Sequence, residues 1–526
     1  MLRIATAVVV AALAGACAGG EPETPREHPR DTSPRTGIDE VVFGRLEKLG
    51  IPPAEACSDE VFVRRAYLDV IGTLPTPKET RQFLADKSPN KRSALIDQLL
   101  EREEFADYWT MKWGDLLRVK AEFPINLWPN AAMAYYRWIR ASVKSNLPYD
   151  RFARELLTAS GSNFRVPQVN FYRATQTKEP EALAKAVALT LLGARAEKWD
   201  KGRLAGMAVL FSQVGFKGTQ EWKEEIVFFD RVKAAKDAAS GAAKAAAFPD
   251  GTPTPLPPDT DPREVFADWL IRPENPWFAR NVVNRIWYWL QGRGIIDEPD
   301  DIRPDNPPSN PELLAHLEKE LVAAKYDLKH VYRLILNSRT YQLSAIPRSK
   351  HADAEANFAF YAIRRLDAEV LIDALCQITG TTEQYSSPIP EPFTFIPAWQ
   401  RSIALPDGSI TSAFLEMFGR PPRDTGLEAE RNNMPSPAQR LHLLNSSHIR
   451  RKIGESKTLA PLLAASGMSQ RSAVTELYLT FLSRFPTDEE LAIVKAYGQS
   501  GEAKGPEALV DLAWALINSA EFLYRH

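Results

Sequence analysis

Apolar residues recur at three- and four-residue spacing along most of this chain, and this periodicity constrains the fold more than any other feature. The run 62–71 is typical, and Gly72 follows it as a helix-ending residue. Thr76, Pro77 and Glu79 then supply an N-cap, a proline at the first helical position and a capping-box glutamate. The pattern predicts a mainly α-helical protein with minor β structure in loops.

The same pattern returns near the carboxyl end of the chain. We interpret the two regions as copies of a helical-hairpin unit of roughly forty residues, one near each end of the folded part. The matching segments are Tyr67-Leu68, Pro75 to Glu79, Leu99-Leu100 and Glu104-Phe105 in the first copy, and Tyr478-Leu479, Pro486 to Glu490, Leu516-Ile517 and Glu521-Phe522 in the second. Repeats of this kind usually serve packing.

The length of 526 residues exceeds what one hydrophobic core usually supports, so two domains are expected, 38–232 and 263–526. Residues 233–262 are the expected linker. They begin as an alanine- and lysine-rich, solvated helix and continue into a proline-rich stretch, 248–258, that lacks the amide donors of regular structure. A second proline-rich stretch, 386–409, predicts a long loop, and loops of that length are functional or mobile.

The amino terminus predicts export. Residues 1–16 place Arg3 before an apolar run that is too short to span a bilayer but suits a signal peptide. Cys17 ends a lipobox-like sequence and is the expected site of lipid attachment, although Leu13 lies four residues before it instead of the usual three. Ordinary signal-peptidase cleavage, giving a soluble secreted protein, stays open. Residues 17–37 predict a disordered tether, so we expect a membrane-anchored lipoprotein facing the periplasm or the cell surface.

The charge balance excludes one class of partner. Lys and Arg number 65 against 67 Asp and Glu, so there is no long-range field to attract nucleic acid. Besides the amino-terminal cysteine, the chain has only Cys57 and Cys376, which form either one disulfide or two separate thiols.

Several segments carry a family resemblance. One set comprises residues 62–77, 146–152 and 160–165, and a second comprises 275–280, 284–287, 292–294, 306–314 and 326–330. These sets resemble, in that order, the paired domains of unknown function 1549 and 1553 of secreted planctomycete-type proteins. The likeness covers most of residues 38–526. It implies a place in the cell envelope rather than a mechanism.

The resemblance also implies haem, because many relatives carry a Cys-x-x-Cys-His motif late in the first domain. Here residues 192–202 contain neither cysteine nor histidine, and covalent haem needs two thiols and an axial imidazole. Relatives often have further cysteines near residues 419–423, where this chain has Leu427 and Ala429. We therefore expect no cofactor.

The densest polar cluster contains Glu428 and Glu430 among Arg420, Arg423 and Arg431. Two carboxylates in different environments are what glycosidic or ester hydrolysis requires. Residues two apart diverge on a helix, however, so a buried network in which the three arginines pair with the two glutamates is the favoured interpretation. Elsewhere, Arg65 and Asp69 lie four apart and predict an ion pair within one helix.

A group of acids offers oxygen ligands for calcium. Asp297, Asp300, Asp301 and Asp305 lie close together in the sequence, but the segment lacks the glycine and terminal glutamate of an EF-hand loop. A turn with solvated acids is the alternative. No metal site is predicted beyond these candidates.

Hydrolase signatures are missing, since the sequence has no His-Glu-x-x-His, Gly-x-Ser-x-Gly or Walker loop. Trp277, Trp287 and Trp289 could stack on sugars, although such spacing is more typical of a core. We expect a non-enzymatic binding or scaffold module for a polysaccharide or envelope protein, with a hydrolase built on Glu428 and Glu430 as the alternative. A deep pocket with convergent carboxylates favours the enzyme, and a shallow aromatic surface favours binding.

Overall fold

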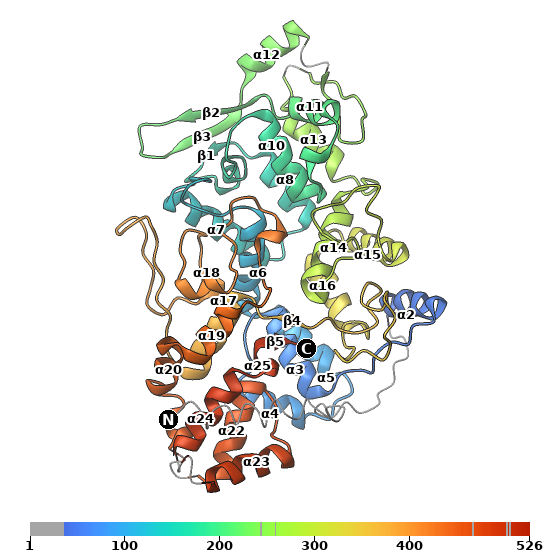
Figure 1. Ribbon diagram of the computed structural model, residues 1–526. Helices are drawn as coiled ribbons and strands as arrows, with labels where there is room; N and C mark the ends of the chain where they lie inside the picture. Colours follow the sequence, from blue (N-terminus) through green and yellow to red (C-terminus); the bar gives the residue numbers. More distant parts are fainter. Residues whose placement is uncertain (1–35, 242–244, 258, 465–467, 501–502, 504–505) are drawn as a thin grey trace.

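The computed structural model describes residues 36–526, apart from 242–244, 258, 465–467, 501–502 and 504–505. Within these residues helices dominate, which confirms the predicted fold class (Figure 1). The longer helices are α2 (Gly37–Leu49), α3 (Asp59–Val70), α4 (Pro77–Ala85), α5 (Lys91–Leu100), α6 (Glu103–Leu116), α7 (Pro129–Lys144), α8 (Tyr149–Thr158), α10 (Pro180–Val187), α11 (Lys201–Val209), α12 (Arg231–Ser240), α13 (Pro262–Leu270), α14 (Phe278–Gln291), α15 (Pro311–Ala323), α16 (Leu328–Asn337), α17 (Ala368–Thr379), α19 (Pro437–Asn445), α20 (Ser447–Gly454), α22 (Gln470–Leu482), α23 (Asp488–Gln499) and α24 (Pro506–Ile517).

Short helical turns fill several connections: α9 (Asn170–Arg173), α18 (Ala413–Met417), α21 (Ala460–Leu463), α25 (Ala520–Leu523) and the 3₁₀ turns η3 (Ala196–Lys198), η5 (Ser402–Ala404) and η6 (Glu428–Glu430). The predicted helix over 62–71 is α3, and Gly72 after it has φ +61°, a left-handed conformation that suits glycine. The predicted capping box begins α4, where Thr76 accepts from the Glu79 amide and Glu79 accepts from the Thr76 amide.

Strands form two small antiparallel sheets. In the first, β3 (Glu225–Phe229) lies between β1 (Gly161–Ser162) and the hairpin partner β2 (Val214–Gly218). In the second, β4 (Arg364–Arg365) pairs with β5 (Tyr524–Arg525). This pairing brings the end of the chain into the middle of the molecule (Figure 1).

The expected linker is partly helical. Its alanine-rich part forms α12, which ends at Ser240, and the proline-rich part is irregular apart from an isolated bridge between Ala247 and Pro253. Phe248 stacks on Trp269 at 4.9 Å between ring centroids, so the segment is packed against α13. The long loop after α17 is closed by an isolated bridge between Ser386 and Thr411.

The two halves of the chain share one hydrophobic core, which contains residues from Ile38 to Phe522. The last helices, α22 to α25, lie beside α3 and α4 rather than at a separate end (Figure 1). Arg81 of α4, for example, donates to Glu476 of α22 at 3.3 Å. The division into 38–232 and 263–526 stays a prediction from sequence.

The predicted signal peptide, the lipid site Cys17 and the tether up to residue 35 lie outside the described residues. Among the described residues, no helix is both long enough and apolar enough to cross a membrane.

Candidate functional site

The two predicted catalytic glutamates point to different neighbours. Glu428 begins η6 and accepts from the Trp289 indole N–H at 3.1 Å, with an Arg285 nitrogen at 3.6 Å. Glu430 accepts from the Thr425 amide at 2.8 Å. Burial raises the pKa of both carboxyls. Because a 3₁₀ turn directs residues two apart away from each other, the pair does not face a common ligand.

The three arginines of this cluster pair with acids from other helices. Arg423 donates to Asp115 of α6 at 2.8 Å, Arg431 bridges Asp115 and Glu369 of α17 at 2.6 and 2.7 Å, and Arg420 lies 3.4 Å from Glu369. The predicted pairing with Glu428 and Glu430 is wrong. Packing against α6 and α17 brings acids from more than fifty residues away to the arginines, and sequence spacing does not reveal this.

The predicted pair within α3 is also wrong. Asp69 accepts from the hydroxyls of Tyr341 and Tyr361 at 2.9 and 2.7 Å and from Arg364 at 3.0 Å. Arg65 instead donates to the main-chain oxygens of Tyr341, Leu343 and His526 at 2.7 to 2.8 Å. Both side chains face the core, where contacts with distant segments are closer than a neighbour on the same helix.

Asp367 occupies the centre of this buried ionic network. It lies 3.1 Å from Lys112 and from Arg525 and 3.6 Å from Arg431, and it accepts from the Tyr108 hydroxyl at 3.2 Å. Burial opposes its ionisation, but these cations hold the pKa of Asp367 well below its usual range. The side chains of Asp367, Lys112, Arg431 and Arg525 are all at most 7% exposed, so the network orders the core.

The four calcium candidates are each held by a basic residue. Asp297 pairs with Arg293 at 3.2 Å, Asp300 with Arg285 at 2.6 Å, Asp301 with Lys198 at 3.2 Å, and Asp305 with Arg303 at 3.1 Å. Among the described residues, no three His, Cys, Asp or Glu side chains are placed to hold a metal ion.

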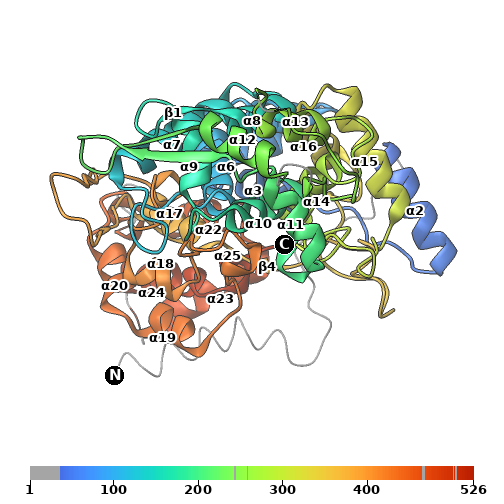
Figure 2. The same cartoon turned by 90° about the horizontal axis from the view of Figure 1, so that it is seen from above.

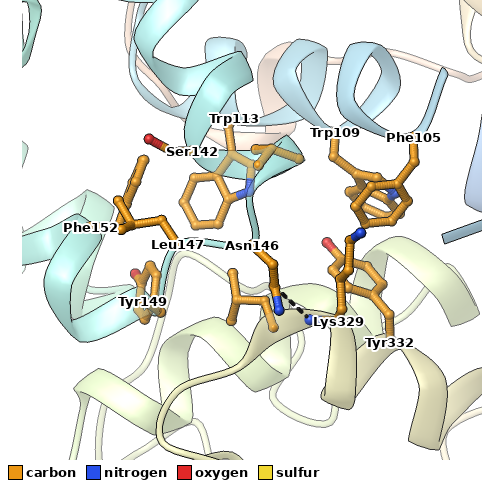
Figure 3. Close-up of a pocket in the computed structure, with 12 residues that line it drawn as sticks. Phe105, Trp109, Trp113, Ser142, Asn146, Leu147, Tyr149, Phe152, Lys329 and Tyr332 are labelled. Atoms are coloured by element: carbon orange, nitrogen blue, oxygen red, sulfur yellow. Dashed lines mark hydrogen bonds between the residues drawn. The ribbon is translucent and has the colours of Figure 1, made fainter. Parts of the chain in front are cut away.

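The predicted aromatic concentration belongs mainly to the core. Trp287 and Trp289 are buried, and Trp277 is half-buried against Trp269 at 5.9 Å. Beside this core lies a small cavity of about 30 Å³ between α6, α7, α8 and α16 (Figure 3). Its aromatic rings point at one another, and a cavity of this size admits a water molecule rather than a ligand.

A larger pocket, of about 380 Å³, lies where the turn before α4, the start of α6 and the end of α17 meet the loop 381–401. We call it the α17 pocket. Its lining includes the carboxylates of Glu79, Glu104, Asp373 and Glu383, and also Cys376. Cys376 and the buried Cys57 are both free thiols.

One wall of the α17 pocket is a carboxylate–arginine–carboxylate group. Arg102 donates to Glu79 at 2.9 Å and to Glu104 at 2.7 Å, and its guanidinium lies over the Tyr67 ring at 5.7 Å. Burial acts to raise the pKa of Glu79, but hydrogen bonds from Thr76 and Arg102 outweigh it and lower that pKa. The hydrogen bond from Arg102 likewise lowers the pKa of Glu104. Both carboxylates are therefore ionised at neutral pH.

The opposite wall comes from the loop. Asp373 accepts from the amides of Ser402 and Ile403 at 2.7 and 3.1 Å, which fixes the end of the loop on α17. The Tyr385 hydroxyl is 2.6 Å from the Ser402 hydroxyl. Trp399 also lines the pocket, and 74% of its surface is exposed. The lining thus combines a large exposed aromatic ring with planar, charged hydrogen-bonding groups.

A chain of polar side chains supports the floor of the pocket. Lys452 lies 3.3 Å from the Cys376 sulfur and 3.0 Å from Glu383, and His448 is 2.9 Å from the same carboxylate. His442 continues the chain at 3.3 Å from His448. Burial raises the pKa of the Cys376 thiol, so the sulfur is protonated at neutral pH and is a poor nucleophile.

The comparisons with known proteins agree with the resemblance seen in the sequence. Residues 37–202 match the family model PSCyt2, "Protein of unknown function (DUF1549)", and residues 262–498 match PSD1, "Protein of unknown function (DUF1553)". The chain belongs to the family that pairs these two domains. Neither a curated protein nor a solved structure matches it.

In this member of the family, the α17 pocket takes one wall from each matched region. Arg102 lies in the first and Asp373 in the second. Neither residue was placed in a site from the sequence. Two signals were present: the capping box of Thr76 and Glu79, and the long proline-rich loop 386–409, whose residues 399–401 line the pocket.

Proposed function

We propose that this protein is an exported, lipid-anchored binding module that holds a carbohydrate in the α17 pocket. The observation that carries the proposal is the lining, in which the exposed Trp399 ring is combined with the planar polar groups of Arg102, Glu79 and Glu104. Sugars present hydroxyl pairs that suit bidentate carboxylate and guanidinium groups, and apolar C–H faces that suit an indole ring. The lining has four carboxylates, Glu79, Glu104, Asp373 and Glu383, against two guanidinium groups, Arg102 and Arg401, which favours a neutral sugar over an anionic one.

The same geometry favours binding over hydrolysis. Glycosidic hydrolysis needs one carboxyl that keeps its proton and one that is ionised, both facing the scissile bond. Glu79 and Glu104 share Arg102 and both have a lowered pKa, so neither supplies the acid. Burial raises the pKa of Asp373, but its two oxygens accept the Ser402 and Ile403 amides and shape the loop.

Membrane attachment rests on the lipobox-like sequence before Cys17. The first described helix, α2, starts with a capping box at Thr36, so the folded body begins about twenty residues after the anchor. Mass spectrometry of the mature amino terminus tests this directly. A diacylglyceryl adduct on Cys17 is expected, and an unmodified cysteine would contradict the anchor.

The binding proposal is tested with oligosaccharides. Trp399→Ala is expected to weaken affinity about tenfold because it removes the stacking face, and Arg102→Met should weaken it by a similar factor. Isothermal titration against a panel of neutral and anionic oligosaccharides measures the change. Phe485→Ala, which removes an aromatic ring exposed at 45% outside the pocket lining, is the matched control and should leave oligosaccharide affinity unchanged. Failure of every saccharide to bind would overturn the proposal.

A further inference from the structure

Two protrusions extend from the same side of the molecule. They are the hairpin between β2 and β3 and the loop 386–401, and both project to the left in the two views (Figures 1 and 2). Each carries exposed aromatic side chains: Trp222 at 67% on the hairpin, and Phe393 at 53% and Phe395 at 71% on the loop. Most large apolar side chains of the described chain are buried, whereas these three rings are more than half exposed and therefore accessible to a partner.

Trp128, in the turn before α7, contacts both protrusions. Trp128 is half-buried and lies 5.4 Å from the Phe393 ring and 6.4 Å from the Trp222 ring. Its amide donates to the Ala121 carbonyl at 3.0 Å, which fixes the turn before α7. We call Trp128, Trp222, Phe393 and Phe395 the aromatic strip. Because Trp128 is anchored, the rings of the two tips have a defined separation.

The aromatic strip and the α17 pocket share one loop of the chain. The loop that carries Phe393 and Phe395 continues directly to Trp399, Gln400 and Arg401, which line the pocket. We infer that the α17 pocket and the aromatic strip form one extended site for a neutral polysaccharide chain, with one end of the chain in the pocket and later sugar rings stacked on the strip. This inference rests on the proposed function and names its ligand class.

The chemistry of the strip favours a sugar chain over a protein or a bilayer. The large apolar side chains exposed on these two protrusions are all aromatic, whereas the exposed set elsewhere includes Leu441, Met434 and Ile346. The Trp128 ring lies 5.4 Å from Phe393 and 6.4 Å from Trp222, at angles of 56° and 84°. This small group of exposed rings offers several faces for stacking on pyranose units, whereas a protein partner would require a broader packed patch. The two protrusions carry three basic residues, Lys217, Lys223 and Arg401, against four acidic ones, Glu221, Glu224, Glu225 and Glu391, so they have no net positive charge to attract an anionic membrane.

The position of α2 agrees with this assignment. Helix α2 lies on the side opposite the two protrusions in both views (Figures 1 and 2). The described part of the chain therefore begins on the side that lies away from the aromatic strip.

The test compares a polymer with its own short oligosaccharide for the full-length protein. The probes are laminarin with laminaritriose, galactomannan with mannotriose, and arabinoxylan with xylotriose, measured by isothermal titration and affinity electrophoresis. The polymer should bind at least about tenfold more tightly than its trisaccharide, because two further rings contribute. Trp222→Ala/Phe393→Ala should reduce polymer affinity to that of the trisaccharide and leave the trisaccharide unchanged.

Matched variants make each outcome decisive. Leu441→Ala/Phe485→Ala removes two large apolar side chains exposed at 59% and 45% outside the strip, and should change neither affinity. If polymer affinity is insensitive to Trp222→Ala/Phe393→Ala, the extended site is overturned while pocket binding stands. If the unmodified protein binds none of the saccharides, the proposed function itself is overturned. Binding of that protein to phosphatidylcholine vesicles through Trp222 and Phe393, without polymer binding, would assign the strip to a bilayer.

Discussion

The two copies of the helical unit share an architecture and differ in what surrounds it. The first copy runs through α3, α4, α5 and α6, and the second through α22, α23, α24 and α25. In the first, Arg102 bridges Glu79 and Glu104 and covers Tyr67. The second copy contains the same group.

In the second copy the arginine comes from elsewhere in the unit. Arg484 follows α22, whereas its counterpart in the first copy precedes α6, yet Arg484 bridges Glu490 and Glu521 at 2.7 and 2.6 Å and covers Tyr478 at 5.3 Å. The carboxylate–arginine–carboxylate group is therefore required by the packing of the unit. The arginine can come from different positions in the unit and still bridge the two glutamates.

The copies differ in exposure. The Arg102 side chain is 29% exposed beside a pocket of about 380 Å³, and that of Arg484 is 7% exposed beside a cavity of about 20 Å³. The loop 381–401 lies against the first copy only. The carboxylate–arginine–carboxylate group of that copy thus becomes part of a candidate binding site, because the loop forms a second wall and leaves a pocket between the loop and Arg102.

The largest expected effect, on the free energy of unfolding, distinguishes the structural role of Arg484 from the binding role of Arg102. Arg484→Ala should lower the free energy of unfolding by about 3 kcal/mol, because it leaves two partly buried carboxylates without a cation. Arg102→Ala should cost only about 1 kcal/mol, since its partners are better solvated, and should also weaken sugar binding. Urea denaturation and titration measure both quantities. Equal stability losses would contradict the distinction between the copies.

The next prediction concerns the contact between copies. Arg64 of α3 donates to the main-chain carbonyls of Phe481 and Phe522 at 2.8 and 3.0 Å. Arg64→Met should destabilise the protein by about 2–3 kcal/mol, because two buried acceptors lose their donor. Arg151→Met, at a side chain that is 70% exposed, is the control and should change stability by less than about 0.5 kcal/mol. A two-step unfolding curve in the unmodified protein would show that the copies unfold separately.

The smallest effect is a pH dependence at the same interface. Burial lowers the pKa of His526 to about 4 from its ordinary value of 6.5. The unfolded histidine takes up its proton near pH 6.5 and the folded one only near pH 4, so this stabilisation is complete above 6.5 and is lost as pH falls through 4. We expect a loss of roughly 1–2 kcal/mol over that range, since the ring is not fully enclosed.

Chemical denaturation at pH 7, 6, 5 and 4 measures the loss, with His526→Gln as the reference that cannot titrate. The difference in stability between the two proteins should shrink across this range. A constant difference would mean that the folded histidine titrates normally.

Local patterns predicted the elements of the first copy well. The helix that became α3, its glycine stop and the capping box of α4 depend on residues within four positions of one another, and all three are present. Ion pairs were predicted poorly by the same reasoning. Asp115 and Glu369, which hold Arg423 and Arg431, are separated from them by 308 and 62 residues.

The sequence by itself determined the helical fold class, the family and the duplication, because helix periodicity, caps and repeated motifs are local properties of the chain. Only the tertiary structure decided which copy carries a pocket. That outcome depends on whether the loop 381–401 lies against Arg102 or Arg484, two arginines that each pair with two glutamates and cover a tyrosine. Long-range packing sets that contact, and no short window of sequence contains it.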